Sequence, residues 1–180
     1  MTYIFLAQGF EEIEALTPLD LLRRAGVEVK TVGIGGKRIV GSHGIAVEAD
    51  MDERDFSDSM PDMIVLPGGM PGTKNLQASE TVMTAIRLAV ECNAFIAAIC
   101  AAPMILGQLG MMRGMKAVCY PGFEEYLPES EILNVPAVRD GKIITGAGMG
   151  AALDFGLLLV SALRGEKVTE ELRHSVIADR

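Results

Sequence analysis

Short apolar runs alternate with amphipathic stretches along most of the chain. Apolar runs rich in β-branched residues and bounded by turn residues are typical of strands buried on both faces. The pattern predicts such strands at residues 2–7, 27–34, 62–66 and 95–99. Shorter strands are expected at 37–40, 45–48 and 117–120. Two more, 135–139 and 142–145, flank Asp140-Gly141, a dipeptide typical of β-hairpin turns.

The stretches between these strands have helical periodicity. Helices are expected at 79–92, 101–109, 148–163 and 167–177, and residues 50–58 form an acidic loop or a short helix. An earlier helix ends before Gly26, but two starts are open for it. It begins near Glu11 and bends around Pro18, or it begins at Thr17, a good cap followed by a proline that suits a first turn.

This order of elements predicts an α/β fold in one domain, residues 1–180. Alternating strands and helices indicate a mainly parallel sheet with helices on both faces, a three-layer sandwich. In open sheets of this kind, ligands bind beyond the carboxyl ends of the strands. The loops at 8–14, 67–72 and 99–103 lie at that edge.

Charge and composition remove several classes of function. With 16 basic and 24 acidic residues, the chain has a net charge of −8, which disfavours sequence-independent nucleic-acid binding and docking on anionic membranes. Residues 92–112 carry no charge and are long enough to span a bilayer. Pro103, Gly107 and Gly110 interrupt this stretch, so we interpret it as a buried strand and helix.

The cysteine and histidine content indicates free thiols in a reducing cytoplasm. The three cysteines form no CxxC motif, and the N-terminus has no basic start or small-residue cleavage site of a signal peptide. Two histidines are too few for a zinc site of the usual kind, so no metal is expected.

Cys100 is the candidate reactive residue. It stands where an apolar strand ends and a helix begins, and small alanines surround it. Free N–H groups and the positive end of a helix dipole lower the pKa of a thiol placed there. A buried structural cysteine explains the same spacing, and we prefer that interpretation for Cys92 and Cys119.

Two other loops bring polar groups to the same sheet edge. Glu11, Glu12 and Glu14 follow the first strand and would repel a flavin or nucleotide phosphate. A carboxylic acid near the thiol would have a raised pKa and could move a proton, although acids also simply favour a first helical turn. Gly68 and Gly69 form a tight turn or present N–H groups that, with that of Ala101, make an oxyanion hole.

Together these segments resemble the ThiJ/PfpI superfamily, and the nearest branch resembles the parkinsonism-associated protein deglycase. The matching segments are QGFEEIE at 8–14, DLLRRAG at 20–26, LPGG at 66–69, AAICAAP at 97–103 and GAGMG at 146–150. The resemblance implies a flavodoxin-like sandwich, a homodimer, and a reactive Cys100 hydrogen-bonded to a protonated Glu14. It also implies the conversion of methylglyoxal to lactate, or the repair of glycated molecules, without a bound cofactor.

The chain departs from the family pattern where relatives carry other residues. Ala101 stands where protease-like members have His, so a conventional Cys-His protease is not expected. Tyr120 stands where the deglycase branch often has His, and a phenol is a poor base near pH 7. Tyr120, Arg24 and His43 are further candidates to line the site.

Three functions follow from this reasoning. In the first, the Cys100 thiolate attacks a small 2-oxoaldehyde or its adduct, and Glu14 moves the proton. In the second, the protein is a redox sensor or chaperone, and an oxidant converts Cys100 to a sulfinate. A cofactor-binding flavodoxin relative is the third, and the acidic first loop argues against it.

Overall fold

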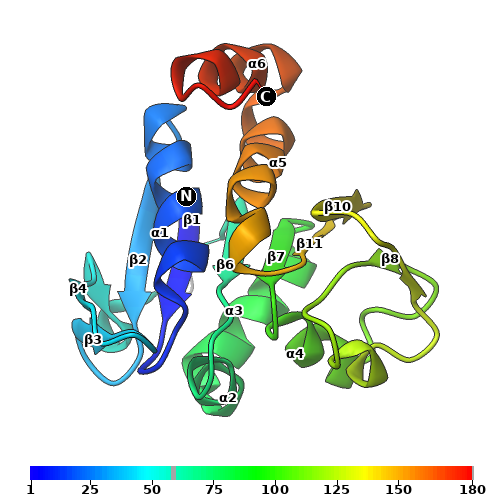
Figure 1. Ribbon diagram of the computed structural model, residues 1–180. Helices are drawn as coiled ribbons and strands as arrows, with labels where there is room; N and C mark the ends of the chain where they lie inside the picture. Colours follow the sequence, from blue (N-terminus) through cyan, green and yellow to red (C-terminus); the bar gives the residue numbers. More distant parts are fainter. Residues whose placement is uncertain (58–59, 180) are drawn as a thin grey trace.

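A seven-stranded sheet forms the centre of the protein, and the computed structural model describes residues 1–57 and 60–179. Its strands lie in the order β10-β11-β7-β6-β1-β2-β5, with β10 at one edge (Figure 1). Their bounds are β1 Thr2–Leu6, β2 Val29–Gly33, β5 Met51–Asp52, β6 Met63–Leu66, β7 Phe95–Ile99, β10 Ala137–Asp140 and β11 Ile143–Gly146. All neighbours are parallel except the β10–β11 hairpin.

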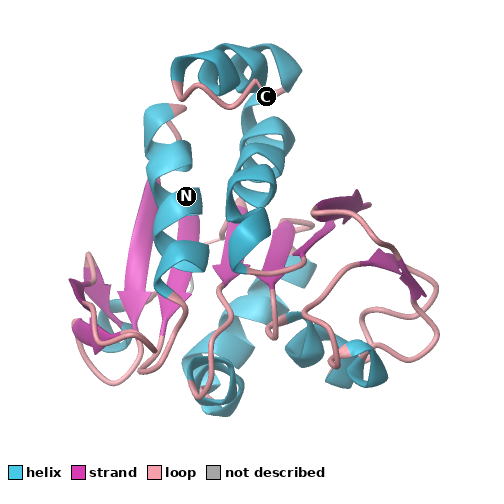
Figure 2. Cartoon of the chain, in the orientation of Figure 1, coloured by secondary structure: helices cyan, strands magenta, loops and turns pink. Residues whose placement is uncertain are grey.

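The central strands are apolar on both faces because helices cover both faces (Figure 2). On one face lie α1 Glu12–Arg24 and α5 Ala152–Arg164, with α6 Glu166–Ser175 packed on α5. On the other lie α2 Gly72–Ala78, α3 Glu80–Glu91 and α4 Pro103–Gln108. Each face buries its own hydrophobic core, which confirms the predicted three-layer sandwich.

The structure decides between the two starts of the first helix. α1 begins at Glu12 and contains Pro18 in its interior. Its axis lies against α5, where Gly156 faces Pro18: a Cβ at Gly156 would lie 3.2 Å from the Pro18 Cα. The longer helix carries Glu12 and Glu14 in its first turn, at the carboxyl end of β1.

Several short elements differ from the sequence-based expectations. Residues 72–78 form α2, which their polar composition did not indicate. Residues 50–57 hold the edge strand β5 and the 3-10 helix Glu53–Asp55, while Asp58 lies outside the described residues. In the expected strand 117–120, only the first residue belongs to a strand, β8 Lys116–Ala117, which pairs with β9 Glu131–Ile132. The helix expected from 148 begins as a 3-10 turn, Met149–Ala151.

The remaining strands form a small antiparallel pair beside β2. β3 Arg38–Val40 and β4 Ala46–Glu48 enclose a loop that reaches the start of α1, because the Gly9 N–H donates to the Val40 carbonyl at 2.8 Å. The loop therefore brings residues 41–45 to the first turn of α1, on the same side as the carboxyl ends of the strands.

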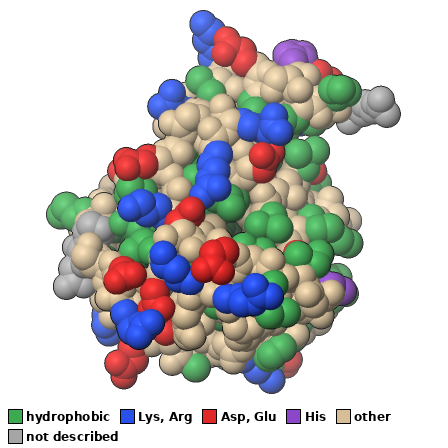
Figure 3. All heavy atoms as spheres, turned by 90° about the vertical axis from the view of Figure 1, so that its left-hand side faces the viewer, with side chains coloured by type: hydrophobic (Ala, Val, Ile, Leu, Met, Phe, Trp, Pro, Cys, Tyr) green, Lys and Arg blue, Asp and Glu red, His purple; other side chains and the backbone are tan. Residues whose placement is uncertain are grey.

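The surface and the helices bear on the classes of partner considered above. On the face shown in Figure 3, Lys and Arg side chains are interspersed with Asp and Glu, without a broad region of one sign. In the part of the chain that the structure describes, no helix has both the length and the apolar character needed to cross a membrane.

Candidate active site

Cys100 lies at a sharp turn directly after β7. Its φ is +66°, in the left-handed region that non-glycine residues rarely adopt. Two hydrogen bonds hold this backbone: its N–H donates to the Gly146 carbonyl, and its own carbonyl accepts the Tyr120 N–H, both at 2.9 Å. A non-glycine residue held in this region by its surroundings is characteristic of functional sites. The turn is the predicted elbow at the carboxyl end of a central strand.

Glu14 reaches this turn from the first turn of α1 and is fully buried. Its Oε2 accepts the Gly68 N–H at 3.0 Å, while its Oε1 has no hydrogen-bond partner in the structure. A Cβ added to Gly68 would lie 2.5 Å from Oε2 of Glu14 and 2.6 Å from the Cys100 Cβ. The absence of a side chain at Gly68 therefore lets the carboxyl and the thiol approach each other.

This proximity couples the protonation of the two side chains. Burial raises the pKa of the Glu14 carboxyl to about 7, against hydrogen bonds from Cys100 and the Gly68 N–H that lower it. Burial and the negative charge of Glu14 raise the pKa of the Cys100 thiol to about 12. Two groups this close share their protons as a pair, and the first proton leaves the pair near neutral pH.

The helix start was expected to lower the pKa of the Cys100 thiol, but that pKa is raised. The N–H groups of Gly69 and Ala101 do lower it, but burial and the neighbouring carboxylate outweigh them. α4 begins only at Pro103, so its dipole contributes less at Cys100 than the sequence suggested. The thiolate becomes accessible when Glu14 keeps the shared proton, because the carboxylate's charge is then removed.

The three N–H groups expected to form an oxyanion hole do not bind the same atom. Gly68 gives its N–H to Glu14 and is not free to bind a substrate oxygen. The N–H groups of Gly69 and Ala101 act on the sulfur itself. Those two N–H groups stabilise negative charge on the sulfur or on atoms bonded to it.

Tyr120 borders the site beside Gly148. Its ring is half-exposed, and a Cβ added to Gly148 would lie 3.3 Å from the ring and 3.8 Å from Oε1 of Glu14. The unpartnered oxygen of Glu14 therefore faces Gly148 and Tyr120. An open cavity of about 530 Å³ continues from here, and its lining includes Tyr120, Val135, Gly148 and Met149.

Neither histidine of the described chain contacts Cys100. His43 bonds Glu12 in the β3–β4 loop, and His174 bonds Asp179 near the C-terminus. His43 therefore lies outside the Cys100 site that it was expected to line. Glu12 also accepts the N–H groups of His43 and Ile45, so this carboxylate bonds the backbone of the β3–β4 loop.

Arg24 does not line the site, so the expectation for this residue was wrong. It lies in the last turn of α1, whereas Glu14 lies in the first, and its side chain pairs with Asp20 at 2.6 Å. An (i, i+4) pair on an exposed helix surface explains this arginine without a role in chemistry.

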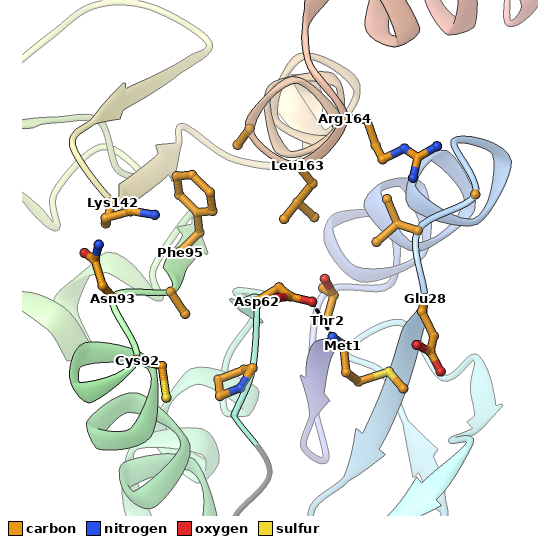
Figure 4. Close-up of a pocket in the computed structure, with 15 residues that line it drawn as sticks. Met1, Thr2, Glu28, Asp62, Cys92, Asn93, Phe95, Lys142, Leu163 and Arg164 are labelled. Atoms are coloured by element: carbon orange, nitrogen blue, oxygen red, sulfur yellow. Dashed lines mark hydrogen bonds and ion pairs between the residues drawn. The ribbon is translucent and has the colours of Figure 1, made fainter.

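The other two cysteines have different surroundings. Cys92 lines a cavity of about 590 Å³ at the amino ends of β1 and β7, where Asp62 bonds the N-terminus (Figure 4). It is thus at the opposite end of β7 from Cys100. Cys119 is buried, and burial raises the pKa of its thiol to about 11. The negative charge of Glu124 also raises the pKa of the Cys119 thiol.

Two features of the site had no sequence signal strong enough to identify them. Gly148, whose missing side chain makes room for Tyr120, lies within the matching GAGMG segment, but nothing in that segment indicates which residue it faces. The contact of Glu12 with His43 joins residues 31 positions apart and depends on where the β3–β4 loop folds.

Comparisons with known proteins agree with this geometry. A model described as the DJ-1/PfpI family matches residues 2–162. Protein DJ-1 homolog B of Arabidopsis thaliana is 35% identical over 170 residues, which cover 93% of this chain and 39% of that longer protein. Protein dj-1beta of Drosophila melanogaster is 32% identical over 177 residues, covering 97% of this chain and 95% of the relative.

One further relative and a solved structure extend the comparison. A Caenorhabditis elegans protein named glutathione-independent glyoxalase DJR-1.2 is 28% identical over 164 residues, covering 90% of this chain and 87% of its own. Toxoplasma gondii DJ-1, solved in an oxidized form, superposes with a TM-score of 0.93 at 30% identity, covering 98% of this chain and 97% of that one. The sequence motifs, the sandwich and these matches agree that the chain belongs to the DJ-1/PfpI family.

Proposed function

We propose that the protein converts small 2-oxoaldehydes, or their adducts, to 2-hydroxy acids without glutathione, with Cys100 as nucleophile and Glu14 as proton carrier. The observation that carries the proposal is the fully buried Glu14, whose Oε1 has no partner beside the strained Cys100 turn. An unpartnered buried oxygen is costly for folding, and a reacting group that exchanges a proton with it explains why it is retained. The C. elegans relative's name supports the same reaction class.

The proposed sequence of steps needs no external oxidant. The Cys100 sulfur bonds to the aldehyde carbon, and the thiol proton passes through Glu14 to the aldehyde oxygen. The Glu14 carboxylate then moves the C–H proton of that carbon to the neighbouring carbonyl carbon, and the hydroxyl proton on the first carbon passes to the neighbouring carbonyl oxygen. The electron pair of the broken C–H bond moves with this exchange, so the first carbon is oxidised to a thioester and the second is reduced to an alcohol. Water cleaves the resulting thioester, releasing the 2-hydroxy acid and restoring the thiol.

Backbone groups and Glu14 have separate roles in these steps. The Gly69 and Ala101 N–H groups favour negative charge at the sulfur when it attacks. A carboxyl with a pKa of about 7 is half protonated near neutral pH, so it both donates and accepts protons there. Glu14 thus takes the role of a histidine base. The chain has Tyr120 at the position where relatives often have histidine.

The test is lactate formation from methylglyoxal in glutathione-free buffer. We expect Cys100→Ser and Glu14→Gln each to lower kcat/KM by about 100-fold or more, since each removes a reacting group. Cys92→Ser is the matched control, because that thiol lies at the other end of β7. Full activity in Cys100→Ser or in Glu14→Gln would exclude this mechanism.

A second candidate is a redox response at the same thiol. The Gly69 and Ala101 N–H groups favour a charged sulfur species, and the Toxoplasma relative was solved in an oxidized form. Under this proposal a peroxide oxidises the Cys100 thiolate to a sulfenate and is reduced to water, and a second peroxide gives the sulfinate. Mass spectrometry after mild peroxide treatment should find Cys100 oxidised before Cys92 and Cys119; the opposite order would refute it.

A further inference from the structure

A second polar cluster lies at the start of α1, apart from the Cys100–Glu14 pair. The β3–β4 loop crosses the helix there and places Ser42 and His43 against Glu11 and Glu12. The Glu12 side chain is 4% exposed and that of Glu11 is 16% exposed, whereas the His43 ring is 68% exposed. Two nearly buried carboxylates thus meet one imidazole that solvent can reach.

The donor atoms of the cluster have the spacing of a tetrahedral metal site. Nδ1 of His43 lies 3.0 Å from Oε2 of Glu12 and 3.5 Å from Oε2 of Glu11. The Ser42 Oγ lies 3.1 Å from the same Nδ1, and 3.2 and 3.4 Å from the two carboxylate oxygens. Ligands at about 2.0–2.1 Å around a tetrahedral Zn²⁺ stand about 3.3–3.4 Å apart. Five of the six edges are therefore already near the length that such an ion requires.

The charge of the cluster also favours a cation. Among the described residues, His43 supplies the ion pairs of Glu11 and Glu12, and no Lys or Arg pairs with either. The Glu12 carboxylate lies against the His43 ring and accepts two N–H groups of the loop, contacts that favour its charged form. Two neighbouring negative charges with little access to water repel each other, and a divalent ion between them would remove that repulsion.

The backbone fixes the orientation of the buried ligand. Oε1 of Glu12 accepts the N–H groups of His43 at 2.8 Å and Ile45 at 3.4 Å, so Oε2 is left to face the imidazole. A Cβ at Gly41 would lie 2.3 Å from the Glu12 carboxyl carbon, so the glycine allows the loop to close over Glu12. Hydrogen bonds that orient a first ligand in this way are a regular feature of metal sites.

We propose that Glu11, Glu12 and His43 bind a divalent cation of the zinc class, with the Ser42 hydroxyl or a water in its place as the fourth ligand. Mixed nitrogen and oxygen donors in this number suit Zn²⁺ and Co²⁺ better than Ca²⁺, which takes more oxygen ligands. Two histidines argued against a usual zinc site, but a donor set built mainly from carboxylates needs only one of them. This site is independent of the proposed 2-oxoaldehyde chemistry.

Calorimetric titration with Zn²⁺ alone, on full-length protein stripped with a chelator, tests the proposal. We expect one Zn²⁺ per chain, and a Kd raised about tenfold or more by His43→Ala and by Glu11→Gln. Both side chains reach the surface, and circular dichroism would verify that each variant is folded. Co²⁺ bound at the same site should lack the near-ultraviolet thiolate-to-metal absorption, because no sulfur is among the ligands.

Two control variants separate this site from other zinc-binding groups. His174→Ala removes the second histidine, which also lies beside a carboxylate, and Cys100→Ser removes the half-buried thiol. Both should leave the Kd unchanged. The proposal is overturned if the unaltered chain binds no Zn²⁺, if His43→Ala and Glu11→Gln bind it as tightly as the unaltered chain, or if Cys100→Ser abolishes binding.

Discussion

The chemistry proposed for Cys100 depends on the Glu14 carboxyl, which is unusual because it is buried. Glu14 is fully buried in the first turn of α1, and only one of its oxygens is hydrogen-bonded. Its raised pKa means that it carries a proton over much of the range in which an ordinary glutamate is ionised. A protonated Glu14 can donate to the sulfur, whereas an ionised one repels the thiolate. The pair is therefore the unit of the proposed mechanism.

At the residue scale, Glu14 should make the protein less stable as the pH rises. Its pKa is about 7 in the folded state against the ordinary 4.5, so the unfolded chain releases this proton first and the folded state is penalised between about pH 4.5 and 7. Glu14→Gln removes that penalty. We expect the loss of unfolding free energy between pH 5 and 8 to be smaller in the variant by about 2 kcal/mol.

Urea unfolding of both proteins at the two pH values measures this difference. Groups remote from Glu14 titrate alike in the two chains, so the difference between the chains reports on Glu14 and on the Cys100 thiol coupled to it. Equal pH dependence in the unaltered protein and in Glu14→Gln would mean that the carboxyl has an ordinary pKa.

At the element scale, the site is assembled by short segments that approach one another without side chains between them. The PGG turn after β6 reaches α1 through Gly68, and the segment after β11 reaches Tyr120 through Gly148. α4, directly after the Cys100 turn, is held against the 3-10 helix Glu124–Tyr126. There a Cβ at Gly107 would lie 1.9 Å from the Tyr126 carbonyl oxygen.

Gly107→Ala should therefore destabilise the protein by about 2 kcal/mol, because a backbone carbonyl cannot yield as a flexible side chain can. Gly150→Ala is the matched control: no heavy atom outside its chain neighbours lies within 4 Å of the added Cβ, and we expect a change within about 0.5 kcal/mol. Thermal unfolding of both variants provides the measurement. Equal midpoints for the two would show that α4 does not pack against residues 124–126 as described.

At the scale of the whole molecule, the sheet order brings three loops to one edge. β1, β6 and β7 are adjacent and parallel, so the segments after them, carrying Glu14, Gly68 and Cys100, meet at their carboxyl ends. This arrangement follows from apolar runs that are readable in the sequence, which is why the fold and the three loops could be predicted. The family resemblance then identified Glu14 as the partner of Cys100.

The remaining features depended on contacts that local patterns do not encode. α2 is short and polar, and it begins two residues after a Pro-Gly-Gly turn, so its residues resemble a loop. The pKa of Cys100 depends on burial and on Glu14, which is 86 positions away in the chain. His43 could be named as a candidate to line the site, but its bond to Glu12 rather than to the thiol is decided by tertiary packing.

The pH dependence of kcat/KM for lactate formation from methylglyoxal tests the central claim, that Cys100 and Glu14 act as one proton-sharing pair. In the unaltered protein kcat/KM should rise with pH around a midpoint near 7, where the pair loses its first proton. In Glu14→Gln that midpoint should disappear and the rate should fall. A Glu14→Gln variant with the same profile and rate as the unaltered protein would contradict the account.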